Sequence, residues 1–119
     1  PQNRYCIENR AADMTMNVYL AFAMTLSAAV EGIKEKIHPG KPTDQDLYEM
    51  SENEFKKLGI KRLPRNLLMA IEALKKDKLS DDVLGPVMKK SFLAYKNDEW
   101  ERYHQSVTDW EVKEYLRLY

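Results

Sequence analysis

Apolar side chains recur at helical spacing over most of the chain. The first such segment runs from about residue 17 to residue 36. Its apolar positions lie three or four residues apart: Val18, Phe22, Leu26, Val30 and Ile33. That spacing places them on one face of an α-helix. Asp13 or Thr15 is a candidate N-cap, and the prolines and glycine of HPGKP (38–42) end the helix.

Capping signals mark the next two helices. Ser51 followed by Glu54 is a capping box, and Gly59 ends the short helix that the box begins. Asn66 caps the helix after it. The apolar stripe of that second helix comprises Leu67, Leu68, Ile71 and Leu74.

The last third of the chain carries two more helical segments. Ser80 is the expected cap of the first, which Gly85 and Pro86 interrupt before it continues to about His104. A second capping box at residues 108–111 begins the final helix. The pattern thus predicts about five or six helices.

Residues 4–10 follow a different pattern. Tyr5, Ile7 and Asn9 alternate with Arg4, Cys6, Glu8 and Arg10. A period of two predicts a short β-strand at residues 4–10. Because a lone strand of this length cannot stand alone, its partners are expected outside this chain. The predicted fold class is mainly α, either an all-α appendage or the helical half of an α+β enzyme.

Composition narrows the function classes. The 119 residues suffice for one domain, and 19 basic residues balance 19 acidic ones, which argues against a nucleic-acid footprint. The longest apolar run, Val18 to Val30, is shorter than a bilayer span requires, so no membrane is expected. The single cysteine, Cys6, forms no intrachain disulfide, which fits a cytoplasmic location. The start at Pro1 favours a piece of a longer protein.

Glu8 and Arg10 are the candidate chemical groups. On a strand they share one face, about 7 Å apart. The carboxylate suits a hard cation such as Mg²⁺ or Mn²⁺, and the guanidinium suits a carboxylate or phosphate. From pattern alone, a solvated charge pair on an edge strand is the more common situation. A plain helical interaction module therefore remains open, and Cys6 has no adjacent base that indicates a nucleophile.

The order of several blocks carries a family resemblance. The chain reads CIENR (6–10), then Asp13 and NVYLA (17–21), and continues through EGIKEKIHPGKP (31–42), LPRNLLMAIEAL (63–74) and WERYHQSVTDWEVKEYL (100–116). These blocks resemble the carboxyl-terminal end of the glutamine synthetase superfamily in order and spacing. Two blocks, LPRNLLMAIEAL (63–74) and YHQSVTDWEVKEYL (103–116), are similar to the bacterial branch that includes glutamine synthetase-like ligases and γ-glutamylmethylamide synthetase.

The resemblance implies both a fold and an activity. Residues 1–119 would be the helical carboxyl-terminal segment of an α+β catalytic domain. Glu8 would ligate one of two divalent metals, and Arg10 would contact the substrate γ-carboxyl and the transferring phosphoryl group. The implied reaction joins ammonia or an amine to glutamate through γ-glutamyl phosphate, with ATP and Mg²⁺ or Mn²⁺.

The departures from the family pattern qualify that expectation. Cys6 occupies the usual position of an arginine that contacts ATP phosphates, and Arg4 is the candidate substitute. The other metal ligands and the amino-terminal part of the protein are absent, so the isolated chain is expected to be inactive. The intact family forms homo-oligomers. The alternative is a non-catalytic helical module, descended from the ligase, for assembly or partner binding.

Overall fold

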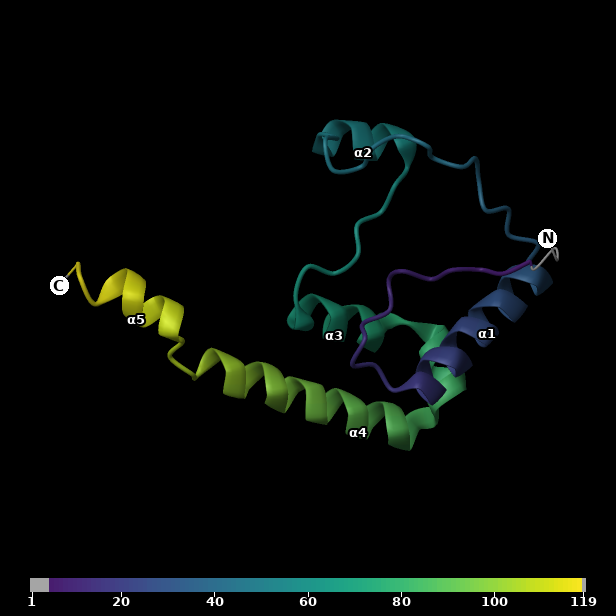
Figure 1. The fold of residues 1–119 in the computed structure, drawn as a ribbon. Helices are drawn as coiled ribbons and strands as arrows, with labels where there is room; N and C mark the ends of the chain where they lie inside the picture. The colour runs from purple at the N-terminus through teal and green to yellow at the C-terminus, as the bar shows by residue number, and fades with distance from the viewer. Residues whose placement is uncertain (1–4, 119) are drawn as a thin grey trace. The chain divides into compact units, whose positions relative to one another are not determined.

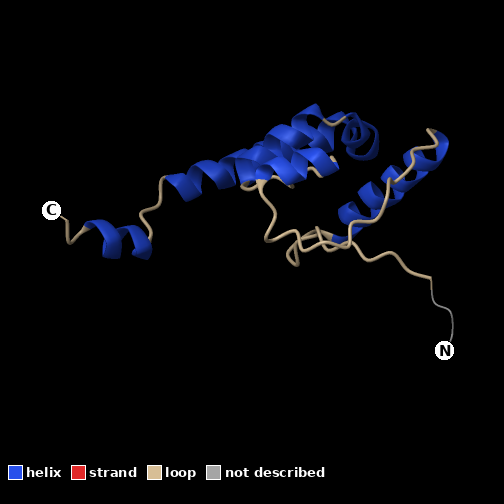
Figure 2. Cartoon of the chain, turned by 90° about the horizontal axis from the view of Figure 1, so that it is seen from above, coloured by secondary structure: helices blue, strands red, loops and turns tan. Residues whose placement is uncertain are grey.

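The computed structural model describes residues 5–118, and all regular structure within them is helical (Figures 1 and 2). The mainly α fold class is therefore confirmed. The helices are α1 (Val18–Lys34), α2 (Glu52–Leu58), α3 (Leu67–Lys76), α4 (Lys78–His104) and α5 (Asp109–Tyr115). The chain divides into two compact units, Pro1–Leu63 and Pro64–Tyr119, which are described separately below.

Helix α1 of the first unit begins after Asn17. The side-chain Oδ1 of Asn17 accepts a hydrogen bond from the Leu20 N–H at 3.2 Å and so acts as the N-cap. The expected caps are wrong, because Asp13 instead accepts the Thr15 N–H at 2.7 Å in a turn before the helix. None of the side chains of α1 is buried.

Local hydrogen bonds cap helix α2 at both ends. Its predicted capping box is confirmed, since the Ser51 N–H donates to Glu54 at 2.7 Å and the Glu54 N–H donates to the Ser51 hydroxyl. Gly59 ends the helix in the left-handed region, as predicted, with φ of 68°. Phe55 is buried, and the Arg62 guanidinium lies 4.0 Å from the centre of its ring.

Helices α3 and α4 of the second unit pack against each other. Asn66 caps α3 as predicted, accepting the Met69 N–H at 2.9 Å, and Ile71 is buried. Asp77 both ends α3 and caps α4. The prediction that Ser80 is the cap is wrong, because Ser80 lies inside α4, fully buried, and donates its N–H to Asp77.

Gly85 breaks the regular geometry of α4. Its φ of 69° and ψ of 166° lie outside the helical region, and Pro86 follows directly. Beyond this kink the helix continues to His104, as the sequence predicts. The capping box at Thr108 and Glu111 is also confirmed and begins α5.

The strand expected at residues 4–10 is not formed in its described part. Residues 5–9 are irregular and a turn begins at Arg10. The Asn9 side chain accepts the Ala11 N–H at 3.0 Å, which bends the chain, and a strand needs partners to supply its hydrogen bonds. Arg4 lies outside the described residues. Across residues 5–118, none of the helices has the length and apolar character needed to cross a membrane.

Candidate functional site

Glu8 and Arg10 contact each other directly. Arg10 Nε donates to Glu8 Oε1 at 2.8 Å, and Arg10 Nη2 lies 3.4 Å from Glu8 Oε2. Each carboxylate oxygen thus faces one guanidinium nitrogen, a two-pronged arrangement. The two side chains are thus in contact, although the backbone that carries them is irregular. Both are exposed, at 69% for Glu8 and 85% for Arg10.

The pair supplies only part of a metal or phosphate site. A carboxylate is a suitable ligand for a hard divalent cation, but such cations take about six oxygens. Within residues 5–118 no group of three or more histidine, cysteine or acidic side chains is placed to hold a metal. The described residues therefore do not form a metal site by themselves. Glu8 fits such a site as one ligand among several, once its oxygens are released from Arg10.

Three other side chains were considered as candidates, and within the described residues the structure gives no contact between them and the Glu8–Arg10 pair. They are Cys6, His38 and His104. Cys6 is exposed, so its thiol is accessible to solvent. His38 and His104 are both exposed, as expected for surface residues. His38 Nδ1 accepts the Gly40 N–H at 3.0 Å, and His104 Nδ1 lies 3.1 Å from the Trp100 carbonyl oxygen. Each histidine is thus engaged by its own helix or turn.

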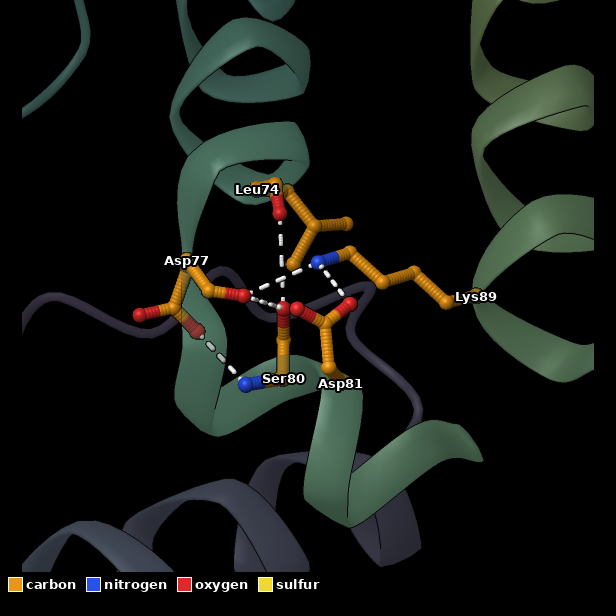
Figure 3. A network of polar contacts seen from close by, with 5 residues as sticks. All are labelled: Leu74, Asp77, Ser80, Asp81 and Lys89. Atoms are coloured by element: carbon orange, nitrogen blue, oxygen red, sulfur yellow. Dashed lines mark hydrogen bonds and ion pairs between the residues drawn. The ribbon is translucent and has the colours of Figure 1, made fainter. Parts of the chain in front are cut away.

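A buried polar network joins α3 to both halves of α4 (Figure 3). Lys89, whose side chain is only 7% exposed, donates to Asp81 Oδ1 at 2.6 Å and to the Asp77 carbonyl at 2.9 Å. The Ser80 hydroxyl donates to the same carbonyl at 2.7 Å and approaches the Leu74 carbonyl at 3.3 Å. Two carbonyls at the end of α3, those of Leu74 and Asp77, therefore accept hydrogen bonds from this network.

This network was not predicted from the sequence. Asp81 and Lys89 are eight residues apart, and in a straight helix that separation is about 12 Å along the axis. Sequence reasoning about helices considers neighbours three or four residues apart. The one available signal was Gly85 followed by Pro86, because a kink there brings the two halves of α4 together.

A shallow hollow of about 280 Å³ lies where α4 gives way to α5. Its lining residues are Tyr103, His104, Ser106, Thr108, Trp110 and Glu111. The Trp100 and His104 rings stack with centroids 3.7 Å apart. Thr108 holds Glu111 through two contacts of 2.8 Å and lowers the pKa of that carboxyl. Two of the polar residues that line the hollow, Thr108 and Glu111, therefore serve as the capping box of α5.

Comparison with known proteins identifies the family. Residues 1–115 match the family model for the glutamine synthetase catalytic domain. The chain belongs to this family, and the resemblance noted in the sequence is confirmed. The match includes the segment that carries Glu8 and Arg10.

Individual relatives agree with that assignment. The chain is 41% identical over 110 residues to a glutamine synthetase of Methanocaldococcus jannaschii, covering 92% of this chain and 24% of the relative. It is 41% identical over 113 residues to a glutamate–methylamine ligase of Methyloversatilis universalis, covering 95% and 25%. A glutamine synthetase of Pyrococcus furiosus is 41% identical over 124 aligned positions, covering 94% and 28%. The chain thus spans about a quarter of the length of these relatives.

Proposed function

We propose that this chain is part of an ATP-dependent ligase that joins ammonia or an amine to the γ-carboxyl of glutamate. The observation that carries the proposal is the family match over residues 1–115, with Glu8 and Arg10 adjacent and in contact within it. The relatives' names include both a glutamine synthetase and a glutamate–methylamine ligase. Both names support the same chemistry with different amines.

The proposed reaction has two steps. A γ-carboxylate oxygen of glutamate attacks the terminal phosphorus of ATP, and ADP leaves. The amine nitrogen then attacks the γ-carbonyl carbon of the resulting acyl phosphate, loses a proton, and inorganic phosphate leaves. Negative charge is concentrated on the phosphoryl oxygens in the first step. A fixed guanidinium at that position lowers the barrier by electrostatic stabilisation.

In this proposal Arg10 binds the γ-carboxyl and the transferring phosphoryl group, and Glu8 is a ligand of Mg²⁺ or Mn²⁺. The metal, when bound, neutralises phosphate charge. The contact between the two side chains has a consequence for both roles. While Arg10 occupies the Glu8 oxygens, neither group is available, so substrate and cation binding must separate them. The remaining ligands and the ATP site would come from other parts of a homo-oligomeric protein.

A non-catalytic helical module is the second candidate. Cys6 favours it, because a thiol cannot replace an arginine as a phosphate-binding cation. Such a module would use the same helices for assembly or partner binding. The upstream reading frame separates the two possibilities. A continuous frame that encodes the other metal ligands supports the ligase, and a start codon near Pro1 supports the module.

Two substitutions in the intact protein test the assigned roles. Glu8→Ala is expected to abolish metal-dependent γ-glutamyl transfer, and unchanged activity would refute the metal role. Arg10→Ala is expected to lower kcat while ATP affinity changes little. If ATP affinity alone fell, the role given to Arg10 would be wrong.

A further inference from the structure

The hollow between α4 and α5 combines aromatic rings with a carboxylate. Tyr103, His104 and Trp110 supply the rings, and Glu111 supplies the carboxylate. These residues lie within nine positions of one another, so the hollow is a local feature of the connection between the two helices. The face of an aromatic ring attracts cations, and rings beside a carboxylate are a combination that binds organic cations.

Two of these rings are held by neighbours outside the hollow. The His104 ring stacks on Trp100, with centroids 3.7 Å apart, and the Trp110 ring meets Tyr115 edge to face at 6.0 Å. Trp110 is still 62% exposed and Tyr103 is 66% exposed, so a ligand from solvent can reach both. Rings that are already ordered lose little conformational freedom when a ligand binds.

One oxygen of Glu111 is engaged in the capping box and the other is available. Both contacts from Thr108, each of 2.8 Å, are made to Oε2. Across residues 5–118 no hydrogen bond is given to Oε1. The bonds from Thr108 lower the pKa of Glu111, so its carboxyl group is ionised at neutral pH. An ammonium N–H can therefore donate to Oε1 while the capping box stays intact.

The surrounding charge also favours a cation. Residues 96–114 contain six acidic side chains and three basic ones. Two of the three basic side chains are already paired, Lys96 with Glu99 and Arg102 with Asp98, each at 2.7 Å. The excess negative charge attracts cations and disfavours anions. Glu111 is the single carboxylate in the lining, which is too few oxygens for a hard metal ion.

We propose that this hollow binds a primary alkylammonium group. Its N–H groups would donate to Glu111 Oε1, and its alkyl carbons would lie against the rings of Tyr103 and Trp110. Two sources carry this group, a free amine and a lysine side chain of another polypeptide. The site does not depend on Glu8 or Arg10, so the proposal stands or falls apart from the proposed ligase reaction.

NMR titration of the ¹⁵N-labelled 119-residue chain with methylammonium chloride tests the proposal. The Trp110 indole N–H and the Glu111 amide should shift and saturate, whereas sodium chloride at equal concentration should not produce this shift. Nα-acetyl-lysine methylamide, titrated in the same way, presents the lysine side chain. Tighter binding of the lysine compound would assign the hollow to a lysine of a partner, and equal or weaker binding would assign it to a free amine.

Three variants separate this site from general attraction of cations. Glu111→Gln removes the charge but keeps a residue that a capping box accepts, and it should weaken binding at least about fivefold. Trp110→Leu removes a ring outside the capping box and should also weaken binding. Asp109→Asn removes the same charge from a neighbour that does not line the hollow, and it should change affinity by less than about twofold. Circular dichroism checks that each variant keeps its helix content.

Three results would overturn the proposal. The first is a titration in which methylammonium and the lysine compound shift no more resonances than sodium does. The second is unchanged affinity in Trp110→Leu, which would leave the rings without a role even if Glu111→Gln failed to fold. The third is a loss in Asp109→Asn as large as that in Glu111→Gln, which would show a diffuse attraction of cations and no site.

Discussion

Lys89 and Asp81 form an ion pair with Nζ and Oδ1 2.6 Å apart, although the two residues are eight positions apart in one helix. The pair spans the kink at Gly85, so its contact and the kink depend on each other. Lys89 also holds the Asp77 carbonyl at the end of α3. One side chain therefore links α3, the first turn of α4 and the segment beyond the kink.

Substituting Asp81 should lower the free energy of unfolding more than substituting Lys89. Without Asp81, the Lys89 ammonium stays almost fully buried and keeps the Asp77 carbonyl as an acceptor, but it has lost its partner of opposite charge. We expect Asp81→Ala to lower the free energy of unfolding by about 1–3 kcal/mol. Without Lys89, the Asp81 carboxylate, 59% exposed, is hydrated, and the Asp77 carbonyl still accepts from Ser80. Lys89→Met should therefore cost less than about 1 kcal/mol.

Urea unfolding of the 119-residue chain, followed by helical circular dichroism, measures both values. The double variant gives the coupling between the two residues. A loss in Lys89→Met equal to or larger than that in Asp81→Ala would contradict this description of the network.

Two glycines should respond to alanine with opposite sign. At both Gly32 and Gly85 an added Cβ meets no atom within 4 Å, so only backbone conformation distinguishes them. Gly85 occupies a region of φ and ψ that only glycine adopts readily, and Gly85→Ala should cost about 1–3 kcal/mol. Gly32 lies inside α1, and Gly32→Ala should stabilise that helix by about 0.5–1 kcal/mol.

Thermal unfolding of the two alanine variants compares them directly. Raised helix stability in Gly32→Ala and lowered stability in Gly85→Ala is the expected pair of results. A Gly85→Ala variant as stable as the parent chain would show that the kink is not a fixed feature of α4.

Helices α2 and α5 should lose their capping contribution in acid. Hydrogen bonds from Ser51 lower the pKa of Glu54 below its ordinary value of 4.5, and those from Thr108 do the same for Glu111. Because these pKa values are lower in the folded chain, the capping boxes contribute fully to helix stability when the pH is above 4.5. This contribution to stability is lost as the pH falls through the lower pKa of each folded-state carboxyl.

Carboxyl NMR titration of the 119-residue chain measures these values. Thr108→Ala should return the pKa of Glu111 toward 4.5 and leave the pKa of Glu54 unchanged. Ser51→Ala should return the pKa of Glu54 toward 4.5 and leave that of Glu111 unchanged. A Glu111 pKa at or above 4.5 in the parent chain would show that the capping box does not form in solution.

The helices could be predicted because their signals are local. Each of three predicted caps places a side-chain oxygen where it accepts an N–H of the following turn. These caps are Ser51, Asn66 and Thr108. The sequence did not indicate Asp77 as the N-cap of α4, because Ser80 is also a residue type that favours this position. The Ser80 hydroxyl instead donates to carbonyls at the end of α3, a contact between helices that no spacing within one helix indicates.

The candidate site was predictable only in part. The alternating pattern indicated that Glu8 and Arg10 are neighbours, and they are in contact, but the strand that it also predicted is not formed in residues 5–10. Strand geometry depends on hydrogen bonds from neighbouring strands, which residues 5–118 do not provide. The roles of the two side chains came from the family resemblance, since an exposed glutamate two residues from an arginine has no specific chemistry by itself.

The exposed pair should contribute little to the stability of the 119-residue chain. Both side chains are more than two-thirds exposed, so water and salt screen their attraction. Glu8→Ala and Arg10→Ala should each change the free energy of unfolding by less than about 0.5 kcal/mol. A larger loss in chemical denaturation would indicate that the pair maintains the fold of this segment.

The metal role proposed for Glu8 is tested most directly by γ-glutamyl transfer in the intact protein with Glu8→Ala, assayed over a range of Mg²⁺ and Mn²⁺ concentrations. Glu31→Ala, a change of the same kind in the last turn of α1, is the matched control. Glu8→Ala is expected to lower activity by at least about a hundredfold at fixed metal concentration, since the proposed metal site would lose a ligand, and Glu31→Ala is expected to retain activity. Parental activity with an unchanged metal dependence in Glu8→Ala would refute the metal role proposed for Glu8.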